Sequence, residues 1–143
     1  MKLSALYQIF LDCQSVTTDS RNCPDGSLFI ALKGESFNGN AFAKLALDSG
    51  CAFAIIDEAE YAVEGDKRYI LVDNCLQTMQ QLANYHRRQL GTRVIGITGT
   101  NGKTTTKELI SSVLCQAHNV LYTLGNLNNP VSYTHLTLPT NSR

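Results

Sequence analysis

One segment, from Val94 to Thr106, constrains the fold more than any other part of this 143-residue chain. It begins with the apolar run Val94-Ile-Gly-Ile97, passes two glycines, Gly99 and Gly102, and continues from Lys103 with the periodicity of a helix. Apolar β-branched residues favour a strand, and glycines allow a tight turn directly before a helix. The segment therefore predicts a strand, a loop and a helix in that order, an arrangement typical of α/β proteins.

The loop has the residue types that hold the phosphates of a nucleoside triphosphate. Its glycines let backbone N–H groups approach phosphate oxygens, and the positive end of the following helix faces the same anion. We expect Lys103 to act in catalysis by supplying a positive charge to the terminal phosphates. We expect the Thr104 hydroxyl to be a ligand for the Mg²⁺ that accompanies ATP. The residues predicted to bind ATP are Thr98, Gly99, Thr100, Asn101, Gly102, Lys103, Thr104 and Thr105.

The loop departs from the general pattern Gly-x-x-x-x-Gly-Lys-Ser/Thr at one position, because Ile97 stands where the pattern has its first glycine. A glycine-bearing turn with an exposed lysine is the alternative interpretation. The order of strand, loop and helix favours nucleotide binding over that alternative.

The composition argues against two classes of protein, those that bind nucleic acid and those that span a membrane. Twelve basic and twelve acidic residues cancel, so there is no electrostatic footprint for nucleic acid, and no apolar run approaches the ~18 residues of a membrane span. Five cysteines occur singly, without a Cys-x-x-Cys pair, and this pattern favours a reducing cytoplasm. Cys51, Cys75 and Cys115 each lie beside apolar residues, and we expect them to be small core residues.

The first ninety residues read as alternating strands and helices. Strands are predicted at 15–21, 28–32, 51–57 and 69–73, and helices at the amphipathic N-terminus, at 41–48 and between Asn74 and Gly91. Asn74 is a suitable N-cap with Gln77 three residues on, and Gly91 is a suitable helix stop. The fold class is thus α/β: a small N-terminal α/β unit, residues 1–88, followed by the start of a P-loop parallel-sheet unit, residues 89–129, with one more strand expected near 119–123.

A polar cluster, Thr18-Asp-Ser-Arg21, follows the first predicted strand. Thr18, Asp19 and Ser20 are suited to the hydroxyl or amide groups of a ligand, and the Arg21 guanidinium is suited to a phosphate or carboxylate. An Asp–Ser turn with a solvated arginine is the alternative.

Four segments taken together, in the same order and spacing, resemble the Mur ligases of bacterial peptidoglycan synthesis, over residues 16–129. They are Thr18-Asp-Ser-Arg21, Gly26-Ser-Leu-Phe-Ile-Ala-Leu-Lys-Gly34, Asn38-Gly-Asn-Ala-Phe42 and Gly99-Thr-Asn-Gly-Lys-Thr-Thr-Thr106. The resemblance implies a three-domain cytoplasmic enzyme, with residues 1–88 as its N-terminal UDP-sugar-binding substrate domain and residues 89–129 as the start of its central ATPase domain. In such an enzyme ATP converts a peptide carboxylate to an acyl phosphate that an amine then attacks. It also implies that Thr18, Asp19, Ser20, Arg21, Lys33 and Gly34 lie near the UDP-sugar part of the substrate.

Two further segments bear on the branch of the family. Thr104-Thr-Thr-Lys-Glu-Leu109 and Gly125-Asn-Leu-Asn-Asn129 favour members that add D-alanyl-D-alanine to UDP-N-acetylmuramoyl-tripeptide. The alternatives are a ligase that adds diaminopimelate or lysine, and a P-loop module that binds nucleotide without ligation. ATP and Mg²⁺ are the expected cofactors, the two peptidoglycan precursors are the expected partners, and we expect a monomer.

The last fourteen residues, 130–143, differ from the family's pattern. We expect this tail to be non-native, adapter-like sequence, and an ordinary divergent tail is the alternative. The rest of the ATPase domain and the family's C-terminal domain lie outside the sequence, so the chain by itself is expected to be inactive as a ligase.

Overall fold

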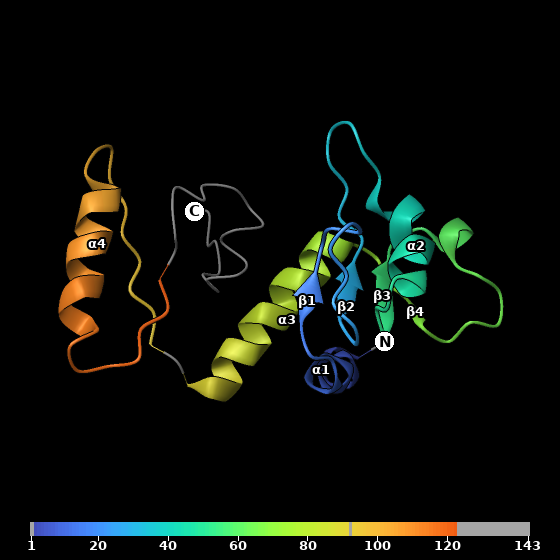
Figure 1. Ribbon diagram of the computed structural model, residues 1–143, viewed down its shortest axis with the longest axis horizontal. Coiled ribbons are helices and arrows are strands. Elements are labelled where there is room, and N and C mark those ends of the chain that lie inside the picture. Colours follow the sequence, from blue (N-terminus) through green and yellow to red (C-terminus); the bar gives the residue numbers. More distant parts are fainter. Residues whose placement is uncertain (1, 92, 123–143) are drawn as a thin grey trace.

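The computed structural model describes residues 2–91 and 93–122. In chain order its elements are α1 (Leu3–Asp12), β1 (Val16–Thr17), β2 (Leu28–Ile30), η1 (Gly39–Phe42), α2 (Ala43–Asp48), β3 (Phe53–Ile56), η2 (Ala59–Tyr61), β4 (Tyr69–Leu71), α3 (Cys75–Leu90) and α4 (Lys103–Leu114). Figure 1 shows α4 standing apart from the sheet.

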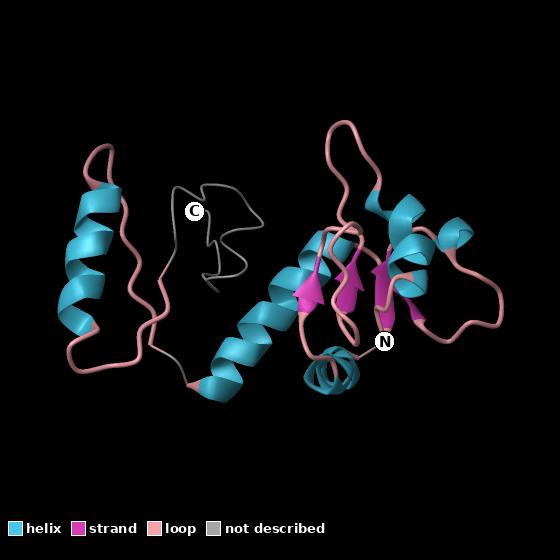
Figure 2. Cartoon of the chain, in the orientation of Figure 1, coloured by secondary structure: helices cyan, strands magenta, loops and turns pink. Residues whose placement is uncertain are grey.

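The four strands form one parallel sheet with the order β1–β2–β3–β4 (Figure 2). Leu28 pairs with Val16 on one side and with Phe53 on the other, and Ile55 pairs with Ile70. Parallel neighbours require a crossover connection, and η1 with α2 supplies the one between β2 and β3. The predicted α/β class is confirmed.

The centre of the core is made by β2 and β3. Leu28, Phe29 and Ile30 are successive residues, and none is more than 1% exposed. Because successive side chains on a strand point to opposite faces, this run shows that both faces of β2 are covered. Helix α2 packs against β2 and β3 through residues such as Ala43 and Ala46.

Helices α1 and α3 pack against each other through aromatic side chains. The Tyr7 hydroxyl lies 3.1 Å from His86 Nδ1, and the Tyr7 ring meets the Tyr85 ring edge-on at 4.8 Å between centroids. Phe10 completes the group with its ring 5.0 Å from the His86 ring. The apolar face predicted for the N-terminal helix, α1, therefore packs against the second half of α3.

The predicted ends of α3 are confirmed. Asn74 Oδ1 accepts a hydrogen bond from the Gln77 N–H at 2.8 Å, which satisfies one of the donors left unpaired at a helix start. Gly91 ends the helix with a φ of 63°, a left-handed conformation that glycine adopts without a Cβ clash.

Strand β1 is shorter than predicted. The Thr17 hydroxyl donates to the Asn22 carbonyl at 2.8 Å, and the Asn22 N–H donates to the Asp19 carbonyl at 3.0 Å. These local bonds turn the chain directly after Thr17, so the expected strand at 15–21 contributes only two residues to the ladder.

The second half differs more from its prediction. Helix α4 follows the loop as expected, but residues 94–98 join no ladder within the described part of the chain. Leu109 and Val113 on α4 are 65% and 71% exposed, and Cys115 is exposed as well, so its prediction as a core residue was wrong. These apolar side chains have no strand to pack against because residues 93–122 contribute none.

Residues 119–122 form no strand, and Thr123 together with the tail at 130–143 lies outside the described residues. Within 2–91 and 93–122, no helix has both the length and the apolar character needed to cross a bilayer.

Candidate functional site

The predicted ATP loop has a backbone that only glycine adopts readily. Gly99 and Gly102 have φ values of 150° and 77°, and Gly102 is the residue from which α4 starts. Gly102 has no side chain with which to cap the helix, so the first turn of α4 directs its backbone N–H groups toward the loop. This is the geometry that binds an anion at a helix N-terminus.

Lys103 folds back over the same loop. Its Nζ donates to the Gly99 carbonyl at 2.6 Å and lies 3.5 Å from the Thr100 carbonyl. Both bonds are exposed to solvent, so a phosphate anion is able to compete for the ammonium. Thr98, Thr100, Asn101, Thr104 and Thr105 are all exposed around it.

The Thr18–Arg21 cluster forms a self-contained turn. The Arg21 backbone N–H and Nε both donate to Asp19 Oδ1, at 3.0 and 2.9 Å, and Nη2 donates to Asp19 Oδ2 at 2.9 Å. These bonds lower the pKa of the Asp19 carboxyl to about 2. Arg21 is 87% exposed, so the guanidinium is held in place by Asp19 while one side remains open to solvent.

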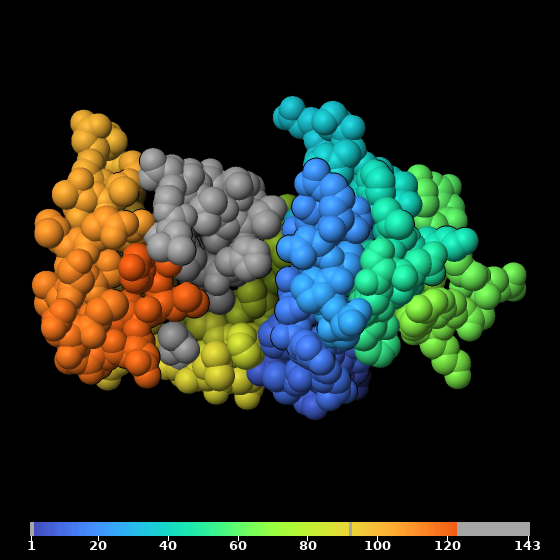
Figure 3. All heavy atoms as spheres, viewed as in Figure 1, coloured from blue at the N-terminus to red at the C-terminus, as the bar shows by residue number. Residues whose placement is uncertain are grey.

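The two predicted substrate segments lie at one edge of the sheet. The Thr18–Arg21 turn follows β1, and Lys33 and Gly34 follow β2, and these strands are parallel neighbours. Their carboxyl ends therefore lie side by side, at the edge where open α/β sheets bind ligands. Beyond it the loop from Lys33 to Asn38 extends from the molecule (Figure 3).

Lys33 is part of an ion-pair network that joins this loop to β3. Its Nζ lies 2.9 Å from Asp57 Oδ1 and 2.8 Å from Glu58 Oε1. Hydrogen bonds to Glu58 and Asp57 raise the pKa of the Lys33 ammonium. The Asp57 side chain is only 6% exposed, whereas that of Lys33 is 43% exposed.

Two asparagines complete the network. Asn38 Nδ2 donates to Glu58 Oε2 at 2.6 Å, and Asn40 Nδ2 donates to Asp57 Oδ1 at 2.9 Å. Asp57 Oδ2 accepts the Cys75 N–H at 3.1 Å, at the first residue of α3. The carboxylate of Asp57 thus connects the end of β3, η1 and the start of α3.

The sequence did not point to Asp57, Glu58 and Asn40, which lie beside the predicted substrate residue Lys33 at this edge of the sheet. One signal for them exists: polar residues directly after a buried strand lie beside the residues that follow the neighbouring parallel strand. Applied to β2 and β3, this rule places Asp57 close to Lys33.

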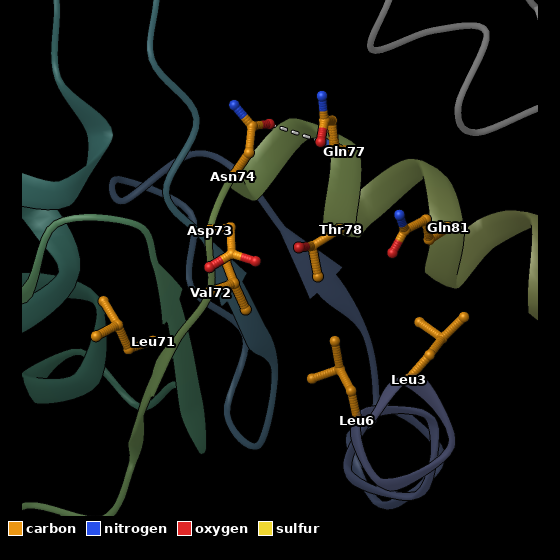
Figure 4. Close-up of a pocket in the computed structure, with 9 residues that line it drawn as sticks. All are labelled: Leu3, Leu6, Leu71, Val72, Asp73, Asn74, Gln77, Thr78 and Gln81. Carbon is orange, nitrogen blue, oxygen red and sulfur yellow. Dashed lines mark hydrogen bonds between the residues drawn. The ribbon is translucent and has the colours of Figure 1, made fainter. Parts of the chain in front are cut away.

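The predicted substrate residues Thr18–Arg21, Lys33 and Gly34, which lie at one edge of the sheet, are called the substrate edge from here on. Within the described residues, this edge and the predicted ATP loop are separate. A third feature, an open hollow of about 170 Å³, lies between α1, the end of β4 and the start of α3 (Figure 4). None of the predicted site residues lines it. Its lining residues are Leu3, Leu6, Leu71, Val72, Asp73, Asn74, Gln77, Thr78 and Gln81.

Comparison with known proteins bears directly on these two sites. Residues 12–87, just over half of the chain, match the family described as "Mur ligase family, catalytic domain", and residues 97–142 match the "Mur ligase middle domain". The first match contains the substrate edge and the second contains the ATP loop. The second also extends into the tail, whose non-native origin stays a prediction.

Two bacterial relatives carry the same name. The UDP-N-acetylmuramoyl-tripeptide–D-alanyl-D-alanine ligase of Bacillus subtilis is 43% identical over 129 residues, which are 89% of this chain and 28% of that protein. The ligase of the same name from Escherichia coli is 38% identical over 82% of this chain and 25% of its own length. The chain therefore spans about a quarter of these relatives.

Solved structures agree in fold. MurF from Acinetobacter baumannii is 32% identical and superposes with a TM-score of 0.77, covering 96% of this chain and 33% of that one. MurF ligase from Thermotoga maritima, in complex with ADP, is 28% identical with a TM-score of 0.78, covering 93% and 30%. With a parallel α/β sheet, a glycine loop before a helix and a family match over more than half its length, the chain belongs to the Mur ligase family.

Proposed function

We propose that this chain supplies the UDP-sugar edge and the ATP loop of an ATP-dependent ligase. The ligase joins D-alanyl-D-alanine to UDP-N-acetylmuramoyl-tripeptide in peptidoglycan precursor synthesis. The observation that carries the proposal is the 43% identity, over 89% of the chain, to a Bacillus subtilis enzyme named for that reaction.

The ATP loop fits the nucleotide in three respects. Gly99 and Gly102 adopt backbone conformations that leave room for phosphate oxygens, and α4 directs its positive end toward them. Lys103 already donates to loop carbonyls, and exchange of these for β- and γ-phosphate oxygens keeps its hydrogen bonds while gaining charge neutralisation. ADP in the Thermotoga maritima relative supports this assignment.

Mg²⁺ fits as an ion that arrives with the nucleotide. The Thr104 hydroxyl opens α4 beside the lysine, and a hydroxyl with phosphate oxygens is a usual ligand set for Mg²⁺. Among residues 2–91 and 93–122, no group of three Cys, His, Asp or Glu side chains is placed to hold a metal.

The chemistry divides into two balanced steps. An oxygen of the substrate carboxylate attacks the γ-phosphorus, and the bond to the β–γ bridging oxygen breaks to release ADP. The D-alanyl-D-alanine amine then attacks the acyl carbon, loses a proton, and expels phosphate. Lys103 and the helix start act in the first step, because they stabilise the negative charge on the transferred phosphoryl group.

The diaminopimelate-adding ligase is the second candidate. Such an enzyme from Bacillus cereus is 36% identical over 80% of this chain, a lower identity than that of the Bacillus subtilis D-alanyl-D-alanine ligase. The D-alanyl-D-alanine ligases of Bacillus subtilis, Synechocystis and Escherichia coli, at 43%, 39% and 38% identity, all exceed this figure and favour D-alanyl-D-alanine as the acceptor.

Acceptor-dependent ADP release by an intact ligase containing residues 1–129 tests the proposal. We expect D-alanyl-D-alanine to stimulate ADP release in the presence of UDP-N-acetylmuramoyl-tripeptide, with no stimulation by diaminopimelate or lysine. The reverse preference with the corresponding dipeptide substrate would establish the second candidate, and nucleotide binding without any acceptor effect would favour a binding module.

A further inference from the structure

The buried Asp57 carboxylate lies at the substrate edge with no role assigned to it. It follows β3 directly, and its contacts reach the loop after β2, the 3₁₀ helix η1 and the first residue of α3. Residues at the carboxyl ends of parallel strands ordinarily face the ligand. Asp57 is instead turned into the protein, with 6% of its side chain exposed.

Asn40 shows that the arrangement has one specific geometry. It is 1% exposed, and both amide hydrogens are used, on Asp57 Oδ1 at 2.9 Å and on Asn38 Oδ1 at 2.8 Å. Its Oδ1 accepts the Asp57 backbone N–H at 3.0 Å. If the Asn40 amide were reversed, its oxygen would face the oxygens of Asp57 and Asn38, and no hydrogen bond would form. The network therefore fixes the orientation of η1 relative to β3.

The start of α3 stabilises the negative charge of Asp57. Burial by itself would raise the pKa of this carboxyl, but hydrogen bonds from Lys33, Asn40 and the Cys75 N–H outweigh burial and lower the pKa. The Cys75 N–H belongs to the first turn of a 16-residue helix, where the dipole favours an anion. Asp57 therefore remains charged and keeps its contacts at neutral pH.

Lys33 is poorly suited to bind a diphosphate in this arrangement. Its one positive charge faces two carboxylates, Asp57 and Glu58, so the three groups carry a net charge of −1. A phosphate that approached Lys33 would meet this negative potential and would have to displace charge-assisted hydrogen bonds of 2.8–2.9 Å.

We propose that Asp57 is a positioning residue for the UDP-sugar. Lys33 holds Asp57 in place through their ion pair and is not a phosphate ligand. Asp57 holds Lys33, Asn40 and the start of α3 together, and thereby fixes the Lys33–Asn38 loop at the carboxyl edge of the sheet. This inference rests on the proposed UDP-sugar binding by the chain.

The two roles for Lys33 predict opposite effects of one substitution. If Lys33 binds phosphate, Asp57→Asn frees its charge and tightens binding. If Asp57 positions the loop, the same substitution weakens binding, because the amide cannot accept from Lys33, Asn40 and Cys75 with the strength of a carboxylate. Titration calorimetry of an intact ligase containing residues 1–129 with UDP-N-acetylmuramoyl-tripeptide measures the direction, and we expect about tenfold weaker binding.

Asp66→Asn is the matched control. Asp66 also accepts hydrogen bonds from a basic side chain, Arg68 at 2.7 Å, but in an exposed turn that contacts neither site. We expect its affinity for the UDP-sugar to equal that of the unsubstituted ligase. Thermal unfolding of both variants separates a loss of affinity from a loss of fold.

Two milder variants decide the question if Asp57→Asn fails to fold. Glu58→Gln removes only the more exposed carboxylate, and we expect its affinity to be unchanged within about twofold or to be weaker; binding tighter by more than about twofold would overturn the inference. Lys33→Met is expected to weaken binding without changing its dependence on salt concentration. A reduced salt dependence would identify Lys33 as a phosphate ligand and would also overturn it.

Failure of the inference differs from failure of the proposed function. If the unsubstituted ligase binds no UDP-sugar, both are overturned. If it binds and Asp57→Asn binds equally well or more tightly, the positioning role alone is overturned and UDP-sugar binding stands.

Discussion

Lys103 Nζ donates to the carbonyl of Gly99, four residues earlier, at 2.6 Å. The two residues bracket the loop, so this bond closes it on itself and places the ammonium beside the backbone that is proposed to receive phosphate. The Gly99 carbonyl therefore holds the Lys103 ammonium close to the proposed phosphate site. When the phosphate binds, the ammonium must leave this carbonyl.

Lys103→Ala removes this charge. In an intact ligase we expect at least a hundredfold loss of ATP turnover, because the substitution removes a group that stabilises the transferred phosphoryl charge. Circular dichroism should show an unchanged fold, since the Lys103 hydrogen bonds are exposed. Lys44→Ala, in the exposed part of α2, is the control and should retain full turnover; turnover by Lys103→Ala at the control's level would contradict the assigned role.

Gly102→Ala and Gly65→Ala form a matched pair. Both glycines have positive φ, 77° and 82°, and a Cβ at either position meets no atom within 4 Å. Each substitution should therefore cost about 1 kcal/mol of local conformational energy. Only Gly102→Ala should weaken ATP binding, as measured by nucleotide titration, because only its Cβ lies where backbone must approach phosphate. Equal affinities in the two variants would argue against a phosphate cradle.

Asp19 provides a prediction for pH. Its pKa is lowered from 3.8 to about 2, chiefly by the side-chain hydrogen bond from Arg21. Because the folded pKa lies below the unfolded one, the interaction contributes its full stability above pH ~4 and loses it as the pH falls toward 2. Carboxyl ¹³C NMR should show the Asp19 pKa rising toward its ordinary value in Arg21→Ala.

The Asp66–Arg68 turn, which precedes β4 at the opposite edge of the sheet, controls for this titration. Asp66 accepts equivalent hydrogen bonds from Arg68, which lower its pKa. Arg21→Ala should leave the Asp66 titration unchanged. A low Asp19 pKa that survives Arg21→Ala would show that another group stabilises the carboxylate.

Asn74→Ala tests the start of α3. The side chain accepts the Gln77 N–H at 2.8 Å, so its removal should lower the free energy of unfolding by about 1 kcal/mol. Asn74→Asp keeps the acceptor and adds a charge that the helix dipole favours, so it should retain or raise stability. Chemical denaturation measures both, and equal destabilisation by the two would rule out capping as the cause.

Local signals account for what the sequence predicted well. The ends of α3 follow from Asn74 and Gly91, whose effects reach only a few residues, and the buried strands β2 and β3 follow from unbroken apolar runs. The Asp57 network was missed because its partners come from four separate segments, and only the strand order brings Lys33 next to Asp57.

The prediction at residues 94–98 went wrong for a related reason. An apolar β-branched run indicates that a segment is able to pair, but pairing also needs a neighbouring strand. Residues 93–122 contain none, so Val94 and Ile95 remain 37% and 61% exposed.

Helix α3 starts on the carboxylate of Asp57 and ends at Gly91, and its 16 residues correspond to a rod of roughly 24 Å. Its first residue is held by the Asp57 carboxylate, and Tyr85 and His86 in its second half pack against Tyr7 of α1. One rigid helix therefore links the end of β3 to the N-terminal helix, although the two are far apart in the sequence.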